Sequence, residues 1–196
     1  SMLVDAKPGM QIADFCSGAG GKTLAMGSFM ANKGRILALD TSLTRLDKAA
    51  LRIKRAGLHN VERRLIGDEA DPKLKRLAKK FDRVLVDAPC SGIGTWRRDP
   101  DIRQRLNRTN LEAMVQVQQK ILVAAARLVR PGGRLIYATC SLLPDENEKQ
   151  IENLLIKRND YSIVSVKEIW SKLDPKIRKW HGMVKNKMMR LTPHQH

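Results

Sequence analysis

The sequence predicts an α/β fold with a doubly wound, mainly parallel sheet of the Rossmann-like type. Five short apolar runs alternate with longer segments in which apolar residues recur every three or four positions. Strands that alternate with helices of this length form parallel sheets with right-handed crossovers. The 196 residues are enough for one domain of ordinary size, and we expect residues 1–196 to form a single domain.

Each predicted strand is a short apolar run that follows a turn. The expected strands are, in order, Gln11–Phe15, Arg35–Asp40, Arg64–Gly67, Asp82–Ala88 and Gly133–Thr139. The helices expected between and after them are Lys22–Asn32, Leu43–Ala56, Pro72–Lys80, Thr109–Val129 and Asp145–Lys157. The last helix starts after Pro144 with acidic residues in its first turn, which the helix dipole favours. Beyond Lys157 the periodicity weakens, so little is predicted there.

The charge of the chain indicates a polyanionic partner. Lys and Arg number 37 against 20 Asp and Glu, which gives a formal net charge of +17. Nucleic acid is favoured over an acidic membrane, because membrane binding needs large apolar anchors and aromatic residues make up only 4% of the chain. A basic surface without a specific partner is the remaining alternative.

Three features bear on location and metal content. No stretch approaches 18 apolar residues, and the first residues lack the features of a signal peptide. Three cysteines without a CxxC pair fit free thiols in a reducing compartment. We therefore expect a cytoplasmic protein that binds no membrane. His194 and His196 suit a polar tail, so no metal is expected.

A glycine-rich loop follows the first predicted strand. It consists of Cys16, Ser17, Gly18, Ala19, Gly20, Gly21 and Lys22. Its glycines let the backbone approach a ligand at the N-terminus of the next helix. A phosphate-binding loop needs four residues between its first Gly and its Gly-Lys, so this spacing excludes one. The loop alone fits a cofactor site and a tight structural turn equally well.

Two acidic residues follow the next two predicted strands. Asp40 lies about 20 residues beyond the glycine loop, where a carboxylate can accept hydrogen bonds from both hydroxyls of a ribose. Asp68 could contact the exocyclic amine of adenine. Helix capping is the alternative for each. Together with the loop, these positions favour an adenosine-containing ligand.

Two cysteines follow the last two predicted strands. Cys90 comes shortly after Asp87, and Cys140 comes directly after Thr139. If these strands are neighbours they lie about 4.8 Å apart, and both thiols leave the sheet at the edge of the glycine loop. A buried structural role is usual for one cysteine. Two at corresponding strand ends, each flanked by serine, favour a functional pair.

These residues resemble the catalytic domain of the Sun (Fmu) family of RNA cytosine-5 methyltransferases, which includes bacterial RsmB. The resemblance spans roughly Pro8 to Leu155. It rests on the Gly20-Gly21-Lys22-Thr23 loop, the block from Asp87 to Asp101, Pro131-Gly132-Gly133, and Thr139-Cys140-Ser141 with Glu146-Asn147-Glu148. The Asp87 block is highly specific and the loop is not. The family has Ala-Pro before its Gly-Gly, where this chain has Gly18-Ala19.

The resemblance implies a class I methyltransferase fold that binds S-adenosyl-L-methionine. The loop from Cys16 to Lys22 would hold this cofactor, with its ribose at Asp40 and Arg45 and its adenine side at Asp68. Its methionine end would lie near Asp87, which alternatively binds the cytosine edge. The resemblance also makes Cys140 the nucleophile and Cys90 the residue that assists product release. The residues alone do not choose between the two thiols.

The implied reaction is methylation of carbon 5 of cytosine in RNA, with ribosomal RNA first and tRNA as an alternative. A thiolate that adds to carbon 6 makes carbon 5 nucleophilic enough to accept the methyl group. The target base must be unpaired or flipped, because carbons 5 and 6 are hidden in a duplex. Arg97 and Arg98 lead a basic segment with Arg103, Arg105 and Arg108, beside Trp96, and would contact the RNA.

Two alternatives remain open. One is a uridine or DNA carbon-5 methyltransferase, against which the second thiol, Cys90, argues by the same resemblance. The other is a basic RNA-binding module without catalysis, against which the presence of Asp87, Cys90 and Cys140 argues. Because family members carry an RNA-binding region before this domain and a further strand after it, we expect the chain to be a fragment. The sequence does not indicate an oligomeric state.

Overall fold

The computed structural model describes residues 1–102, 107–172, 183–185 and 187–190. Arg103, Arg105, His194 and His196 lie outside the described residues. The chain divides into two compact units, which are described separately. The first unit comprises Ser1–Pro89 and Gln116–Thr139, and the second comprises Cys90–Val115 and Cys140–His196.

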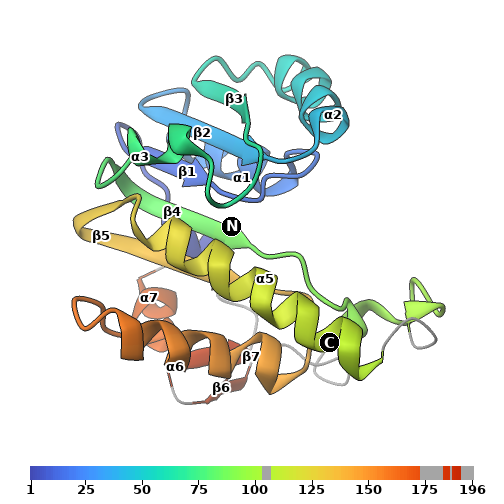
Figure 1. Cartoon of the computed structure of the whole chain (residues 1–196). Helices are drawn as coiled ribbons and strands as arrows, with labels where there is room; N and C mark the ends of the chain where they lie inside the picture. Colours follow the sequence, from blue (N-terminus) through green and yellow to red (C-terminus); the bar gives the residue numbers. More distant parts are fainter. Residues whose placement is uncertain (103–106, 173–182, 186, 191–196) are drawn as a thin grey trace. The chain divides into compact units, whose positions relative to one another are not determined.

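The first unit is built on a five-stranded parallel sheet with the order β3-β2-β1-β4-β5 (Figure 1). Its strands are β1 Gln11–Asp14, β2 Arg35–Asp40, β3 Val61–Leu65, β4 Phe81–Asp87 and β5 Val129–Ala138. The connecting helices are α1 Gly21–Met30, α2 Leu43–Arg55, α3 Pro72–Lys75 and α5 Arg108–Ala126, of which the part from Gln116 belongs to this unit. Since the order reverses between β1 and β4, the predicted doubly wound α/β fold is confirmed.

Helices cover both faces of this sheet. Right-handed crossovers place α1 and α2 on one face and α3 and α5 on the other (Figure 1). Strands covered on both faces are apolar almost throughout, and β4 is buried over its first six residues. On the α1 face, the largest packed cluster consists of Val4, Ile12, Met26, Met30, Ile36 and Leu85. The core therefore holds the strands rigidly up to their carboxyl ends.

Three elements of this unit differ from the prediction. β3 spans Val61–Leu65 instead of Arg64–Gly67, because an edge strand pairs on one side only and needs no continuous apolar run. α3 ends at Lys75 instead of Lys80, and the turns that follow it include Lys79 with a φ of 57°. β5 begins at Val129, where the prediction still had a helix. The chain leaves α5 at Ala126 and pairs with β4 after a two-residue turn.

The second unit is mostly helical in its described part. It contains the 3₁₀ helix η2 Ile93–Thr95, the start of α5, the 3₁₀ helix η3 Pro144–Glu146, α6 Glu148–Lys157, α7 Val166–Ser171, and a hairpin of β6 Met183–Lys185 and β7 Met188–Arg190. The helix predicted over Asp145–Lys157 is thus interrupted at Asn147, whose backbone is not helical. Its side chain donates hydrogen bonds to two preceding carbonyls instead. Across the described ranges, no helix is long and apolar enough to cross a membrane.

Candidate functional site

The glycine loop lies at the carboxyl edge of the sheet, where the strand order reverses. Two backbone hydrogen bonds attach it to both neighbours of β1: Phe15 donates to Leu85 of β4, and Ser17 donates to Leu39 of β2. Gly18 and Gly20 have φ values of 55° and 80°, which side chains other than glycine rarely adopt. The loop then enters α1 directly. Crevices at such reversal points are where α/β sheets bind ligands.

Asp40 holds the glycine loop against β2. It is buried at the end of the strand, and its Oδ2 atom accepts a hydrogen bond of 2.8 Å from the Gly18 amide. Its Oδ1 atom accepts one of 2.8 Å from the Ser42 amide. Ser42, and not Asp40, is the N-cap of α2, since its hydroxyl accepts from the Arg45 amide. Each Asp40 oxygen keeps a second lone pair for a further donor.

Two further contacts at the loop were not predicted. Lys22 Nζ forms an ion pair with Asp87 Oδ2, which joins the start of α1 to the end of β4. Arg52 of α2 donates from Nη1 to the carbonyl of Ala19 at 2.9 Å. Both contacts join residues that are far apart in sequence and depend on how the helices pack. No local pattern indicates them.

Asp14 is a buried carboxylate beside the loop that the sequence analysis did not single out. It ends β1, and its Oδ2 atom accepts a hydrogen bond of 2.6 Å from Thr23 Oγ1. Within the described ranges, its Oδ1 atom has no hydrogen-bond partner. Burial raises the pKa of this carboxyl to about 6. An acidic residue that ends an apolar strand just before a glycine loop was the available signal.

We expect Asp14→Asn to stabilise the protein above pH 6. The unfolded carboxyl ionises near pH 4, whereas the folded one ionises near pH 6. The stability due to the retained proton is therefore present below pH 4 and is lost as the pH rises through 6. Asparagine can still accept from Thr23 and does not titrate. Chemical denaturation should show the variant gaining about 3 kcal/mol over wild type between pH 4 and pH 8. A difference that is constant with pH would contradict the buried charge.

Cys16 is not suited to act as a nucleophile. It is half-buried in the loop, and burial together with the carboxylates of Asp14, Asp40 and Asp87 raises its pKa to about 12. The thiolate is the reactive form of cysteine, so a thiol with this pKa is inert at neutral pH. Cys16 contributes backbone and volume to the loop.

Asp68 and Arg45 lie at the same edge but do not join the loop network. Asp68 is exposed after β3, and its Oδ1 atom accepts from the Ala70 amide at 2.7 Å. The N-cap of α3 is Asp71, which accepts from Lys73. Arg45 is exposed on the first turn of α2. Among the described residues, neither side chain is hydrogen-bonded to the glycine loop.

In the second unit, Cys90 and Cys140 form a close pair of thiols. Their Sγ atoms are 3.1 Å apart, and either can donate the hydrogen bond between them. This hydrogen bond, followed by burial, holds the pKa of Cys90 well above its usual range. Cys90 is half-buried and Cys140 is exposed. The pair therefore presents one accessible sulfur next to one sulfur that retains its proton.

Glu146 connects the residues that follow the two cysteines. It is fully buried and accepts from the Ser91 amide at 2.7 Å and from the Ser91 hydroxyl at 2.5 Å. The Ser91 hydroxyl also lies 3.4 Å from that of Ser141. The Cys140 carbonyl accepts a hydrogen bond of 3.0 Å from the Gly94 amide. These contacts fix the backbone on both sides of the thiol pair.

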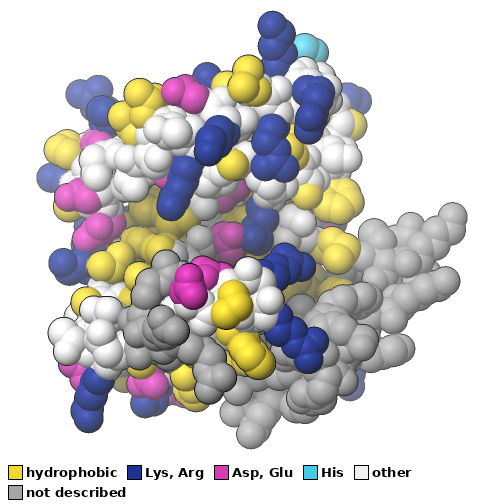
Figure 2. Space-filling model, turned by 90° about the vertical axis from the view of Figure 1, so that its right-hand side faces the viewer, with side chains coloured by type: hydrophobic (Ala, Val, Ile, Leu, Met, Phe, Trp, Pro, Cys, Tyr) yellow, Lys and Arg dark blue, Asp and Glu magenta, His cyan; other side chains and the backbone are white. Residues whose placement is uncertain are grey.

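The predicted RNA-binding residues are exposed on the second unit. Arg97 and Arg98 follow η2, next to Trp96, whose side chain is 41% exposed. Arg108 is paired with Glu112 at 2.9 Å. Figure 2 shows Lys and Arg side chains spread over one face of the molecule, with hydrophobic side chains between them. The described residues contain no group of three or more side chains that could hold a metal ion.

Comparisons with known proteins place the chain among RNA methyltransferases. Residues 1–196 match the model of a family described as 16S rRNA methyltransferase RsmB/F. A probable ribosomal RNA small subunit methyltransferase B from Synechocystis sp. is 38% identical over 161 residues, which cover 82% of this chain and 36% of that protein. Its counterpart from Yersinia enterocolitica is 36% identical over 162 residues, or 83% of this chain and 37% of that protein. The chain thus spans little more than a third of the length of these relatives.

A solved structure agrees with these matches. The crystal structure of NSun6 from Pyrococcus horikoshii with SFG superposes with a TM-score of 0.83 at 30% identity. The superposition covers 99% of this chain and 46% of that one. It therefore extends over both units of the chain.

Proposed function

Since the chain belongs to the RsmB/F family of 16S rRNA methyltransferases, we propose that it transfers a methyl group from S-adenosylmethionine to carbon 5 of a cytosine in ribosomal RNA. The thiol pair is the observation that carries the proposal, because addition of a cysteine to carbon 6 is the step that makes carbon 5 reactive. The names of the curated relatives support ribosomal RNA as the substrate. We also propose that the protein works in the cytoplasm.

The loop edge of the first unit fits S-adenosylmethionine. The ligand of the NSun6 structure, SFG, is an analogue of this cofactor. In our proposal Gly18, Gly20 and the rest of the loop from Cys16 to Lys22 hold it, and Asp40 accepts from its ribose hydroxyls. Arg45 assists at the ribose, and Asp68 at the adenine. The unpartnered oxygen of Asp14 fits a buried site that awaits a donor.

Asp87 is proposed to act at the boundary between cofactor and substrate. Its carboxylate is already paired with Lys22, so the two charges balance each other without a ligand. Either the ammonium of the methionine moiety or the amine of the cytosine can donate to the Asp87 oxygens. The bound cofactor supplies the methyl group as an electrophile.

The two thiols have different roles in the proposed reaction. Cys140, the exposed one, adds to carbon 6 as a thiolate and forms a carbon–sulfur bond, which makes carbon 5 nucleophilic. After methylation, carbon 5 loses its proton, the carbon–sulfur bond breaks and the electron pair returns to the Cys140 sulfur. Cys90, 3.1 Å away and protonated, donates a hydrogen bond to that departing sulfur. Arg97 and Arg98 contact the RNA backbone.

A thermal-shift experiment tests the cofactor site without requiring activity. S-Adenosylmethionine at 100 times its dissociation constant should stabilise the chain by about 2.7 kcal/mol and raise its melting temperature. Asp40→Ala should remove most of that shift, because it removes the proposed ribose acceptor and the tether of Gly18. Asp47→Ala, which deletes an exposed carboxylate of α2, is the matched control and should keep the shift. No shift for wild type at millimolar cofactor would refute the assignment.

A further inference from the structure

A cationic pocket lies on the face of the sheet opposite α1, away from the glycine loop. It has a volume of about 500 Å³ and is lined by Gln11, Arg35, Arg64, Arg76, Leu77, Lys80 and Phe81. Gln11, Arg35 and Phe81 are the first residues of their strands, whereas the glycine loop follows the last residue of β1. The pocket is therefore separate from the site described above.

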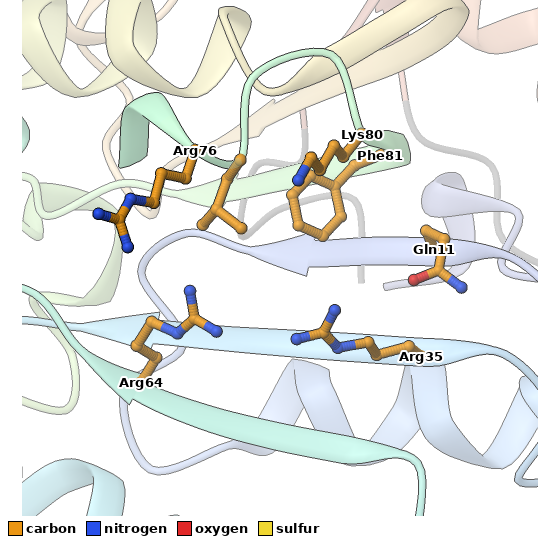
Figure 3. Close-up of a pocket in the computed structure, with 7 residues that line it drawn as sticks. Gln11, Arg35, Arg64, Arg76, Lys80 and Phe81 are labelled. Carbon is orange, nitrogen blue, oxygen red and sulfur yellow. The ribbon is translucent and has the colours of Figure 1, made fainter. Parts of the chain in front are cut away.

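The pocket exists because α3 is short. Arg35 and Arg64 project from β2 and β3 on the face that α3 covers, since they alternate with Ile36 and Arg63 along their strands. α3 makes only one turn, so this corner of the sheet lacks a full helix above it. In Figure 3 the guanidinium groups of Arg35 and Arg64 extend from the strands towards the segment that carries Arg76 and Phe81. Leu77 and Phe81 are buried and form the apolar floor.

Four cations converge on this pocket, and one carboxylate balances them in part. Glu62 is ion-paired with both Arg35 and Arg64. Across the described ranges, Arg76 and Lys80 have no ion-pair partner, and both side chains are exposed. Three positive charges thus remain in excess around one hollow. Like charges held this close repel each other, and an anion in the pocket would relieve that repulsion.

We propose that this pocket binds a phosphate group. Arginine guanidinium groups on two sides of a hollow suit phosphate oxygens, which they bind by paired hydrogen bonds. The phosphate comes either from the RNA backbone or from a free nucleotide. The RNA source rests on the proposed function, whereas the phosphate site itself does not. In the RNA case the pocket anchors the substrate away from the reacting cytosine.

The test compares two pairs of substitutions that remove equal charge. Arg76→Gln with Lys80→Gln removes the two unpaired cations of the pocket without breaking the ion pairs of Glu62. Lys54→Gln with Arg55→Gln removes one Lys and one Arg that are exposed at the end of α2. Each variant is titrated with inorganic pyrophosphate and with ATP by thermal shift, and with a single-stranded oligoribonucleotide by fluorescence anisotropy. The S-adenosylmethionine shift is measured in parallel as the control for folding.

We expect the pocket variant to lose the pyrophosphate shift and to bind the oligoribonucleotide about 25-fold more weakly at 0.1 M salt. Each lost phosphate contact lowers the log-log salt slope of single-strand binding by about 0.7, which is about fivefold in affinity at that salt. The α2 variant should keep the pyrophosphate shift.

Loss of the pyrophosphate and ATP shifts with unchanged RNA affinity would identify a nucleotide as the phosphate source. Equal losses in both variants, or no loss in either, would overturn the proposal. Because pyrophosphate binding requires neither cofactor nor methylation, failure of the phosphate site is distinguishable from failure of the proposed function.

Discussion

Cys140→Ala is expected to abolish both RNA methylation and the covalent protein–RNA adduct. The exposed Cys140 sulfur forms the bond to carbon 6, and no other described thiol can replace it. Cys90 retains its proton because of the hydrogen bond to Cys140 and burial, and the Cys16 thiol has a pKa near 12. Methyl transfer is measured with labelled cofactor and unmodified ribosomal RNA, and the adduct is detected as a band that resists SDS. Wild type is assayed in parallel.

Cys90→Ala should give the opposite result at the adduct stage. The bond to carbon 6 can still form, but the departing sulfur lacks the hydrogen bond of its 3.1 Å neighbour, so the adduct accumulates. The double variant should behave as Cys140→Ala, because a later step has no effect once the first is blocked. Both single variants should keep the cofactor thermal shift, since the cofactor residues lie in the first unit. An adduct in Cys140→Ala that disappears in Cys90→Ala would reverse the assignment.

Gly94→Ala is expected to reduce methylation by about 100-fold, although it changes no reactive group. A Cβ atom at Gly94 would lie 2.4 Å from the carbonyl oxygen of Cys140, far closer than real contacts allow. The Gly94 amide also donates to that oxygen at 3.0 Å. The substitution must therefore displace the backbone that carries the nucleophile, and a misplacement of about 1 Å can cost about 100-fold in rate. Steady-state kinetics with ribosomal RNA measure the effect.

Gly67→Ala is the matched control for this substitution. A Cβ atom at Gly67 would meet nothing nearer than Asp71 Oδ2 at 3.9 Å. Its kinetics should be those of wild type. The Gly94→Ala protein should keep the cofactor thermal shift, which shows that the first unit is intact. If Gly94→Ala kept at least a tenth of the wild-type rate, the position of the Cys140 backbone would not be critical.

The sequence predicts the fold class well because buried parallel strands and amphipathic helices have different apolar periods. It predicts β2 without error, since both faces of that strand are covered. It misplaces β3, an edge strand whose charged residues hide it from a search for apolar runs. It overextends α3, because helical periodicity continues through turns that backbone geometry ends. The rule that parallel strands share one carboxyl edge is sufficient to select the glycine loop, Asp40 and Asp87.

Through-space contacts could not be predicted in the same way. The ion pair of Lys22 with Asp87 joins residues 65 positions apart, and the contact of Glu146 with Ser91 spans 55 positions. Such partners are set by the packing of whole elements, and no local pattern records them. Asp14 is different, because a carboxylate at the end of an apolar strand is visible in the sequence and was passed over. The cationic pocket depends on the shortness of α3, which the sequence analysis overestimated.

The central position of β1 in the sheet has a consequence for how the chain folds as it is synthesised. One edge of β1 pairs with β2, which follows soon after, but the other pairs with β4, and Gln11 is 71 residues from its partner Asp82. Until β4 leaves the ribosome, that edge of β1 keeps unpaired backbone groups beside apolar side chains. Exposed edges of this kind promote pairing with other chains. Parallel pairing over such separations is also slow. The nascent chain therefore needs chaperone protection most before residues 81–87 emerge.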